Sequence, residues 1–464
     1  MAVRHFCVAH LFADTPEKGS PVVLTISPED ITARPISGKR TAIIAWCVFD
    51  WANSSIPTII TTFVFSAYFT TAVAPNPELG TALWGQTNSI AALVTALIAP
   101  LLGAIADQSG RQKPWLLVFS TLCIAATASL WFVRPEESDV VFALVVYGIS
   151  VLGFEMALVF YNAMLPELAG SDRVGRLSGW GWGLGYLGGL TCLIICLVIF
   201  VQPDPSPFGL DRETAEHVRI TNPFAAIWFA VFAVPLFLLV PDRGRRGLPW
   251  VAAARAGASA LVATFRRLRA NRNVMIFLCA KMIYIDGLNT LFAFGGVYAA
   301  ATFGMSFDEI LIFAIMLNVS SGLGAIAFAW IDDWLGAKPT ILTALAGMTV
   351  LSAAILVVES KTAFTVLAIG LGLFFGPAQA ASRSLMARLA PPESRAEFFG
   401  LFALAGKVTA FVGPALVGWV TFAAGSQRVG MATILPFFVI GAALLLLVKE
   451  VRAEGSHTGV TGNP

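Results

Sequence analysis

Long apolar segments, separated by short polar or Pro/Gly-rich breaks, dominate the chain. Several run for about 20 residues with few or no charged side chains, which is the length that a helix needs to cross a hydrocarbon layer of about 30 Å. Lipid offers backbone N–H and C=O groups no partner, so such segments are expected to be helices. Only 12% of the residues are charged, against about 25% in soluble domains. The sequence therefore predicts an all-α polytopic membrane protein.

The apolar segments fall into two groups of six. The first group is predicted at 41–70, 84–106, 114–133, 140–164, 176–201 and 223–241, and the second at 274–300, 308–331, 338–357, 363–388, 397–423 and 429–449. The predicted organisation is an N-terminal tail (1–40), a first half (41–241), a basic linker (242–273), a second half (274–449) and a C-terminal tail (450–464).

Lysine and arginine are concentrated in the even-numbered connections, the linker and the tails. The positive-inside rule therefore predicts that both termini and the linker are cytosolic. The N-terminal tail has no apolar core followed by a small-residue cleavage site, so it is expected to be a flexible cytosolic tail and not a signal peptide. Abundant arginine and alanine favour a bacterial cytoplasmic membrane. The net charge of +2 gives no reason to expect nucleic acid as a partner.

The two halves contain similar short motifs. The connections after the second and eighth predicted spans read GAIADQSGRQKPW (103–115) and AWIDDWLGAKPT (329–340), and both carry Asp-x-x-Gly followed by Lys-Pro. The first span contains Asp50-x-x-Asn53, and the seventh contains Asp286-x-x-Asn289. Corresponding motifs in corresponding spans indicate an internal repeat. Two six-helix halves around a central cavity are the expected architecture.

A glycine row in GWGWGLGYLGG (179–189) places Gly181, Gly185 and Gly189 on one face of the fifth span. Small residues let two helix backbones approach closely. The row therefore predicts a tight helix–helix seam.

Ionisable and amide side chains inside the predicted spans need a reason, because a charge at the membrane centre costs about 2.5–3.5 kcal/mol on insertion scales. The residues expected to bind a substrate or a coupling ion are Asp50, Asn53, Glu155, Asn162, Lys281, Asp286, Asn289, Gln379 and Lys407. Structural ion pairs, or capping of broken helices, are the alternative. Arg383 is expected near the cytosolic end of its span, where its guanidinium can reach the membrane surface.

These features carry a family resemblance. The predicted spans, the basic linker and the Gly-x-x-x-Asp-x-x-Gly-Arg-x-Lys pattern at 103–113 resemble the major facilitator superfamily. Four stretches are similar to its vacuole-effluxer branch, namely DWANSS (50–55), FYNAMLPELA (160–169), YIDGLNT (284–290) and GPAQAASRSLMARLAPPESRAEFFG (376–400). The resemblance covers all twelve spans but not the tails. RQKPW (111–115) also resembles the glycoside–cation symporters.

The resemblance implies the major facilitator fold and secondary transport by alternating access. Fungal members of the branch export amino acids from vacuoles, so proton-coupled efflux of amino acids or similar small zwitterions is expected. The paired acids and bases listed above are compatible with a substrate that bears both charges. The resemblance also implies a cytoplasmic gate formed by Gly103, Asp107, Gly110, Arg111, Lys113, Asp333 and Gly336.

Two other functions stay open. A cation-coupled sugar or glycoside carrier would use the same fold, and a non-transporting membrane sensor or assembly protein would show no flux. No nucleotide-binding loop, metal-ligand cluster or nucleophile–base arrangement is present in the sequence, so we predict neither an enzyme nor a bound cofactor or metal. The expected partners are a small-molecule substrate, protons or another coupling ion, and the lipid bilayer, with the protein as a monomer.

Overall fold

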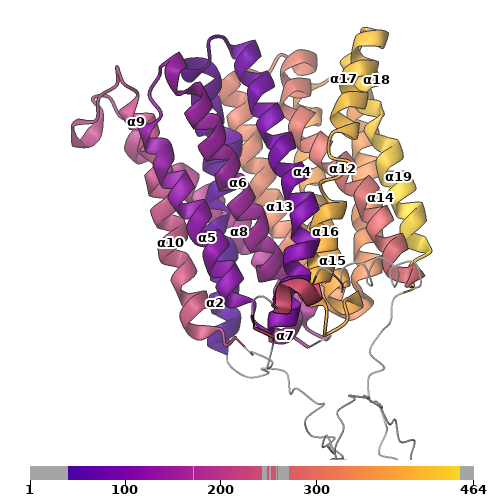
Figure 1. The fold of residues 1–464 in the computed structure, drawn as a ribbon. Coiled ribbons are helices and arrows are strands. Elements are labelled where there is room, and N and C mark those ends of the chain that lie inside the picture. Colours follow the sequence, from indigo (N-terminus) through magenta and orange to yellow (C-terminus); the bar gives the residue numbers. More distant parts are fainter. Residues whose placement is uncertain are drawn as a thin grey trace, which may run out of the picture. The chain divides into compact units, whose positions relative to one another are not determined.

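The computed structural model describes residues 40–449, apart from 171, 243–247, 250–251, 258 and 260–270. All regular structure in these residues is helical (Figure 1), which confirms the predicted fold class. The N-terminal tail predicted at 1–40 lies outside the described residues, except for Arg40, where the first helix begins. The tail 450–464 and most of the linker also lie outside them.

The first half begins with a long helical segment that crosses from α-helical to π-helical geometry. It consists of α2 (Arg40–Asn53), η1 (Ile56–Phe63), α3 (Phe65–Tyr68) and η2 (Phe69–Val73). The other elements of this half are α4 (Pro77–Ser109), α5 (Lys113–Ser129), η3 (Leu130–Phe132), η4 (Glu137–Asp139), α6 (Val140–Ala163), α7 (Leu165–Leu168), α8 (Val174–Ile195), η5 (Cys196–Val201), η6 (Pro207–Gly209), α9 (Glu216–Arg219) and α10 (Thr221–Leu239).

The second half has fewer irregular segments. Its elements are α12 (Arg272–Phe303), α13 (Phe307–Leu335), α14 (Ala337–Val357), α15 (Lys361–Leu389), α16 (Arg395–Ala405), α17 (Val412–Ala424), α18 (Gln427–Ala432) and α19 (Ile434–Leu446).

Eleven helical segments of the described chain are long and apolar enough to cross a membrane. The predicted span at 397–423 is different, because it consists of the shorter helices α16 and α17 with a turn at 406–411 between them. Pro414 lies in the first turn of α17. Proline is tolerated there because its missing N–H would have no helical partner, but its ring would clash with the preceding turn if α16 continued into α17 as one helix. We call the turn at 406–411 the α16–α17 break.

The predicted glycine row forms a close seam. A Cβ on Gly185 would lie 2.8 Å from the Ser54 hydroxyl, and one on Gly188 would lie 2.7 Å from the Cα of Trp51, so α8 rests directly on α2. A second row on α8 faces the other half, because a Cβ on Gly179 would lie 2.5 Å from the carbonyl of Ala325 on α13. Glycines on both faces therefore let α8 lie between its own half and the opposite one.

One end of the helical bundle carries the connections at 110–112, 169–173, 240–242, 336 and 390–394, and we call it the basic end. In Figure 1 it is the end marked by α7. Lys113 donates hydrogen bonds to the carbonyls of Phe237 and Val240 where α10 ends, at 2.7 and 2.6 Å. Lys338 does the same to Leu446 and Val448 where α19 ends, at 2.8 and 2.7 Å. A cation at a helix C-terminus is favourable, and both halves use this contact.

Candidate functional site

Two aspartates of the repeated motif connect the halves at the basic end. Asp107 at the end of α4 accepts hydrogen bonds from the backbone N–H groups of Ala396 and Glu397, at 3.1 and 2.8 Å, in the first turn of α16. Asp333 at the end of α13 accepts hydrogen bonds from the backbone N–H groups of Gly175 and Arg176, at 2.8 and 3.2 Å, in the first turn of α8. Each carboxylate therefore occupies the positive end of a helix dipole from the opposite half. We call these two contacts the carboxylate clamps.

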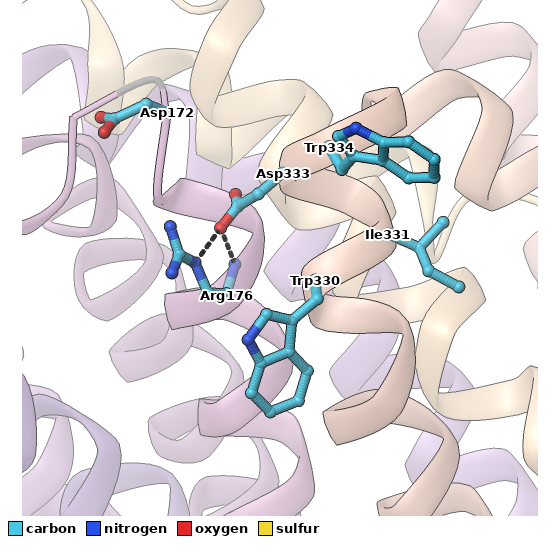
Figure 2. A pocket seen from close by; sticks show the side chains of 6 residues that line it. All are labelled: Asp172, Arg176, Trp330, Ile331, Asp333 and Trp334. Atoms are coloured by element: carbon cyan, nitrogen blue, oxygen red, sulfur yellow. Dashed lines mark hydrogen bonds and ion pairs between the residues drawn. The ribbon is translucent and has the colours of Figure 1, made fainter.

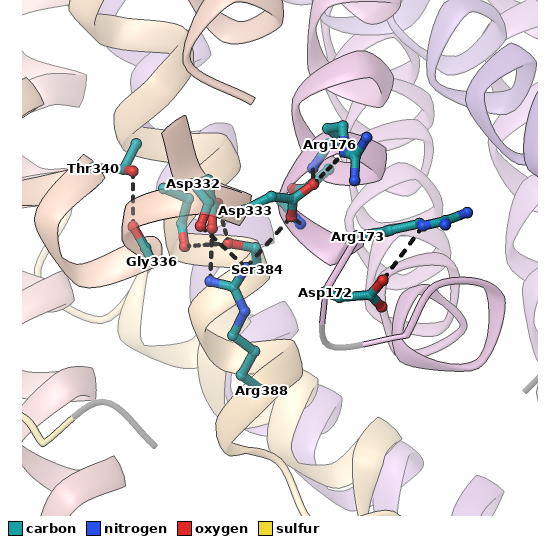
Figure 3. Close-up of polar contacts among 12 residues, drawn as sticks. Asp172, Arg173, Arg176, Asp332, Asp333, Gly336, Thr340, Ser384 and Arg388 are labelled. Carbon is teal, nitrogen blue, oxygen red and sulfur yellow. Dashed lines mark hydrogen bonds and ion pairs between the residues drawn. The ribbon is translucent and has the colours of Figure 1, made fainter. Parts of the chain in front are cut away.

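The second clamp carries extra charge. The Nε of Arg176 donates to Asp333 at 2.6 Å, as Figure 3 shows. The neighbouring Asp332 is buried, accepts a hydrogen bond from the Ser384 hydroxyl and pairs with Arg388 at 2.6 Å. A charge-assisted network therefore ties α8, α13 and α15 together at this end.

Glycines permit the close approach of α4 and α16 at the Asp107 clamp. A Cβ on Gly103 would overlap the carbonyl of Ala396, and one on Gly400 would lie 2.6 Å from the carbonyl of Ala99. Of the other predicted gate residues, Gly110 and Gly336 end α4 and α13 with positive φ angles of 69° and 107°. Arg111 is exposed beside them, and Lys113 binds within its own half as described above.

A shallow pocket of about 430 Å³ lies beside the Asp333 clamp (Figure 2). Its lining consists of Asp172, Arg176, Trp330, Ile331, Asp333 and Trp334. The rings of Trp330 and Trp334 are half exposed or more, as is typical of tryptophan near a membrane–water interface.

A buried ion pair between the halves lies deeper in the bundle. Asp50 on α2 pairs with Arg383 on α15 at 3.1 Å, and both side chains are almost fully buried. Asp50 is ten residues beyond the start of α2, which corresponds to about 15 Å along a helix. Gly181 makes room for the pair, because a Cβ there would overlap the Asp50 carboxylate.

All three guanidinium nitrogens of Arg383 donate hydrogen bonds. Besides Asp50, it donates to the hydroxyl and carbonyl of Ser178 at 2.9 and 2.6 Å and to the side-chain oxygen of Asn162 at 3.2 Å. Its guanidinium carbon lies 4.9 Å from the ring centre of Trp46. The expectation that Arg383 reaches the membrane surface is therefore wrong: only 3% of the residue is exposed, because acceptors and an aromatic face within the bundle replace water.

A second ion pair between the halves lies further from the basic end. Lys407, in the α16–α17 break, pairs with Glu155 on α6 at 2.6 Å, and the two side chains are 29% and 18% exposed. Glu155 precedes Asn162 by two turns of α6, about 10 Å along the helix. Lys281 on α12 is buried nearby and interacts electrostatically with Lys407 and Glu155. One acid and two bases from both halves therefore meet in the middle of the bundle.

Helix α12 binds the chain on both sides of the α16–α17 break. Lys281 donates to the carbonyl of Phe402 in the last turn of α16 at 2.9 Å. Asp286 accepts from the N–H of Gly413 in the first turn of α17 at 3.1 Å. A cation at a helix C-terminus and an anion at a helix N-terminus are both favourable. Capping of a broken helix, which the sequence offered as the alternative to substrate or ion binding, therefore describes contacts that Lys281 and Asp286 make.

The remaining predicted site residues are less connected. Gln379 donates to the Tyr186 hydroxyl across the halves at 3.1 Å. Asn53 is buried, and its amide nitrogen has no acceptor among the described residues. Asn289 is exposed. The structure thus brings Asp50 and Asn162 together around Arg383, and Glu155 and Lys407 together with Lys281 close by.

Comparisons with known proteins agree with this architecture. The family model described as "Vacuole effluxer Atg22 like" matches residues 80–175 and 170–456. An uncharacterised MFS-type transporter of Bacillus subtilis, YxiO, is 28% identical over 412 residues, which cover 88% of this chain and 94% of the relative. Autophagy-related protein 22 of Coccidioides immitis is 22% identical over 455 residues, which cover 81% of this chain and 74% of the relative.

Solved structures show the same fold at low sequence identity. The proton:xylose symporter XylE matches with a TM-score of 0.67 and 14% identity over 88% of this chain and 94% of its own. The human organic anion transporter MFSD10 matches with a TM-score of 0.66 and 15% identity over 88% of this chain and 99% of its own. These matches confirm the resemblance expected from the sequence, a multi-pass integral membrane protein with the major facilitator fold. The chain is therefore an MFS transporter that belongs to the Atg22-like vacuole-effluxer family.

Proposed function

We propose that this protein exports amino acids or similar small zwitterions by alternating access, driven by a proton gradient. The observation that carries the proposal is the pair of Glu155 and Lys407, which come from opposite halves and are both partly exposed. Glu155 lies about two turns of α6 further from the basic end than Asn162. The buried amine of Lys281 interacts electrostatically with both of them. Sites at the interface between two repeats are where many secondary transporters bind substrate.

A zwitterion fits this arrangement better than a neutral or singly charged molecule. Its ammonium group can take the place of Lys407 on Glu155, and its carboxylate can bind Lys407 together with Lys281. A singly charged molecule would separate the pair and leave one charge without a partner, which is costly in a poorly hydrated site. A neutral sugar would gain little from breaking the pair. The charges therefore favour amino acids over the sugar alternative.

Counterflow in liposomes tests the substrate class. Liposomes that contain the purified protein are loaded with one unlabelled compound, in a screen over amino acids and sugars. Liposomes loaded with an amino acid that is a substrate should transiently accumulate its labelled form. Glu155→Gln and Lys407→Gln should each lower the counterflow rate about tenfold or more, since about 1.4 kcal/mol of lost binding corresponds to a factor of ten. Counterflow of sugars but of no amino acid would overturn the proposal.

The chain offers a matched control for these substitutions. Lys361 and Glu309 form an ion pair at 2.9 Å within the second half, but both side chains are more than 40% exposed. An exposed pair of this kind contributes about 0–1 kcal/mol. Glu309→Gln and Lys361→Gln should therefore leave counterflow unchanged.

The orientation of the protein is part of the proposal. The excess of lysine and arginine favours a cytosolic location for the basic end and both termini, in a bacterial cytoplasmic membrane. With this orientation, the carboxylate clamps close the cytosolic side in the structure. A transporter in that state is open or occluded toward the outside, where an exporter releases its substrate.

Cysteine labelling in cells tests the orientation. Arg111 at the basic end and Phe208 in the connection between α8 and α10 are both exposed. In a background without native cysteines, Phe208→Cys should react with a membrane-impermeant maleimide in intact cells. Arg111→Cys should react only after the membrane is permeabilised, and the reverse pattern would show the opposite orientation.

A further inference from the structure

Asp286 has an unusual environment for a buried acid. Only 1% of the residue is exposed, and its Oδ2 accepts the N–H of Gly413. Its Oδ1 is buried and has no hydrogen-bond partner among the described residues. By contrast, Asp50 and Glu155 each face an arginine or lysine at 3.1 Å or less.

Most charged residues of the surrounding helices are engaged elsewhere, and the others lie at helix starts far from Asp286 in the sequence. Helices α17 and α19, which pack on α12, contain no charged residue, and Arg428 of α18 donates to the carbonyl of Val358. Lys281, on α12 itself, donates to Phe402. Six further ion pairs hold charged groups of the packed elements: Lys407 with Glu155, Arg383 with Asp50, Lys361 with Glu309, Arg388 with Asp332, Asp333 with Arg176, and Arg395 with Glu167. Arg272 begins α12, fourteen residues before Asp286 and therefore about 21 Å from it along the helix. Asp308 is the second residue of α13, beyond the other end of α12. Glu397 at the start of α16 lies beside the Asp107 clamp at the basic end.

An ionised carboxylate in this place would be costly, because a single amide N–H does not compensate the burial of a full charge. A metal cation would neutralise the charge of the carboxylate, but hard cations take six or more oxygen ligands. No group of three or more His, Cys, Asp or Glu side chains in the described chain could hold a metal ion. A proton needs only the one free oxygen.

A hydroxyl group lies on the same side of the site as the free oxygen. Thr290 donates its hydroxyl hydrogen to the backbone carbonyl of Asp286 at 2.7 Å, which leaves the lone pairs of its oxygen available. Both the Thr290 hydroxyl and the Asp286 Oδ1 border the space where a Cβ on Gly413 would lie. The free oxygen of Asp286 and the Thr290 hydroxyl therefore border the same small space, which the absence of a side chain on Gly413 leaves open.

We propose that Asp286 is the group that binds the coupling proton, a role that rests on the proposed transport function. A hydronium ion transfers the proton to Oδ1: one O–H bond of the hydronium breaks, an O–H bond forms on Oδ1, and a water molecule is left. Oδ2 continues to accept the N–H of Gly413.

The α16–α17 break links this proton to the substrate charges. An ionised Asp286 holds the N-terminus of α17 by charge and hydrogen bond, and such a contact is worth about 0.3–2 kcal/mol. Protonation weakens that contact. Lys407 lies in the same break and pairs with Glu155 of the opposite half, so movement of the break changes the central pair directly.

Asp286→Asn tests the coupling, because asparagine keeps an acceptor for Gly413 but cannot bind and release the proton. The variant should retain counterflow, which needs no proton gradient, while its accumulation ratio in a pH gradient falls to one. Glu309→Gln, which removes an exposed carboxylate, should keep both activities. Full accumulation by Asp286→Asn would overturn the proposal, and so would loss of counterflow with folded protein, which indicates a capping role only.

Infrared spectroscopy provides a readout that does not depend on the substrate. Wild-type protein at neutral pH should show the absorption of a protonated carboxyl group, and this absorption should be weaker in Asp286→Asn. Asp50→Asn should retain that absorption at full strength, because the Asp50 carboxylate pairs with Arg383. An unchanged band in Asp286→Asn would overturn the assignment even if no amino acid is transported, whereas absence of amino-acid counterflow in the wild type alone would refute only the substrate class.

Discussion

Replacing Arg383 with methionine is expected to destabilise the folded protein by about 3–5 kcal/mol, because Asp50 is then left buried without its cation. The substitution also removes the donors to Ser178 and Asn162. Thermal unfolding of the purified protein in detergent, followed by intrinsic fluorescence, measures the loss. We expect this to be the most damaging single substitution at the predicted site.

A double-mutant cycle separates the ion pair from simple packing. Asp50→Asn alone should cost less than Arg383→Met, since a neutral amide remains where the carboxylate was. Combining the two should recover part of the stability lost in Arg383→Met, because no charge is then buried alone. Strictly additive losses would mean that the two residues act independently and would contradict the pairing at 3.1 Å.

The ion pair also bears on transport. Asp50 and Arg383 belong to opposite halves, and the halves of such transporters move relative to each other. The pair must therefore break when the basic end opens. The pair lies deeper in the bundle than the carboxylate clamps, and we expect the two layers of contact together to hold this end closed.

The sequence allowed one partner of this pair to be predicted and not the other. Asp50 sits in an otherwise apolar segment beside Asn53, so its cost in the membrane made it conspicuous. Arg383 lies close to the end of its span, where a long side chain can reach water, so its sequence context favoured a surface role. Its partners come from α2, α6 and α8, and a single sequence does not show which distant helices meet.

The α16–α17 break was only partly visible in the sequence. Composition predicted one span at 397–423, because its residues are almost uniformly apolar. Pro414, together with Gly406 and Gly413, was a signal for interruption that hydropathy does not weigh. Lys407 was among the predicted site residues, but its contact with Glu155 depends on the turn that the break creates.

The carboxylate clamps show a different limit. Asp107 and Asp333 stood out as charged residues in a repeated motif. Their partners are backbone N–H groups of Ala396, Glu397, Gly175 and Arg176, and any residue type can supply such a donor. The stretches LAGSDRVGRLSG (168–179) and LAPPESRAEFFG (389–400) are similar enough to have indicated corresponding helix starts. Comparing those two stretches would have located the partners.

Neutralising both clamps is expected to open the basic end. In Asp107→Asn, the side chain keeps one acceptor and loses both its charge and its second hydrogen bond, and Asp333→Asn loses the same contacts together with the pair to Arg176. Hydrogen bonds to charged groups contribute about 1.5–3 kcal/mol each, so each substitution should shift the equilibrium between closed and open states about tenfold or more.

Because the clamps connect the halves at two separate places, the double variant should shift the equilibrium further than either single one. Spin labels at Arg111 and Glu393, which are exposed on opposite halves of the basic end, would report the opening as a longer distance. Gly103→Leu should produce the same shift without any change of charge, since a side chain there overlaps the carbonyl of Ala396. Glu309→Gln, far from this end, should leave the distance unchanged. An unaltered distance in the double variant would show that the clamps do not hold the end closed and that the buried Asp50–Arg383 pair suffices.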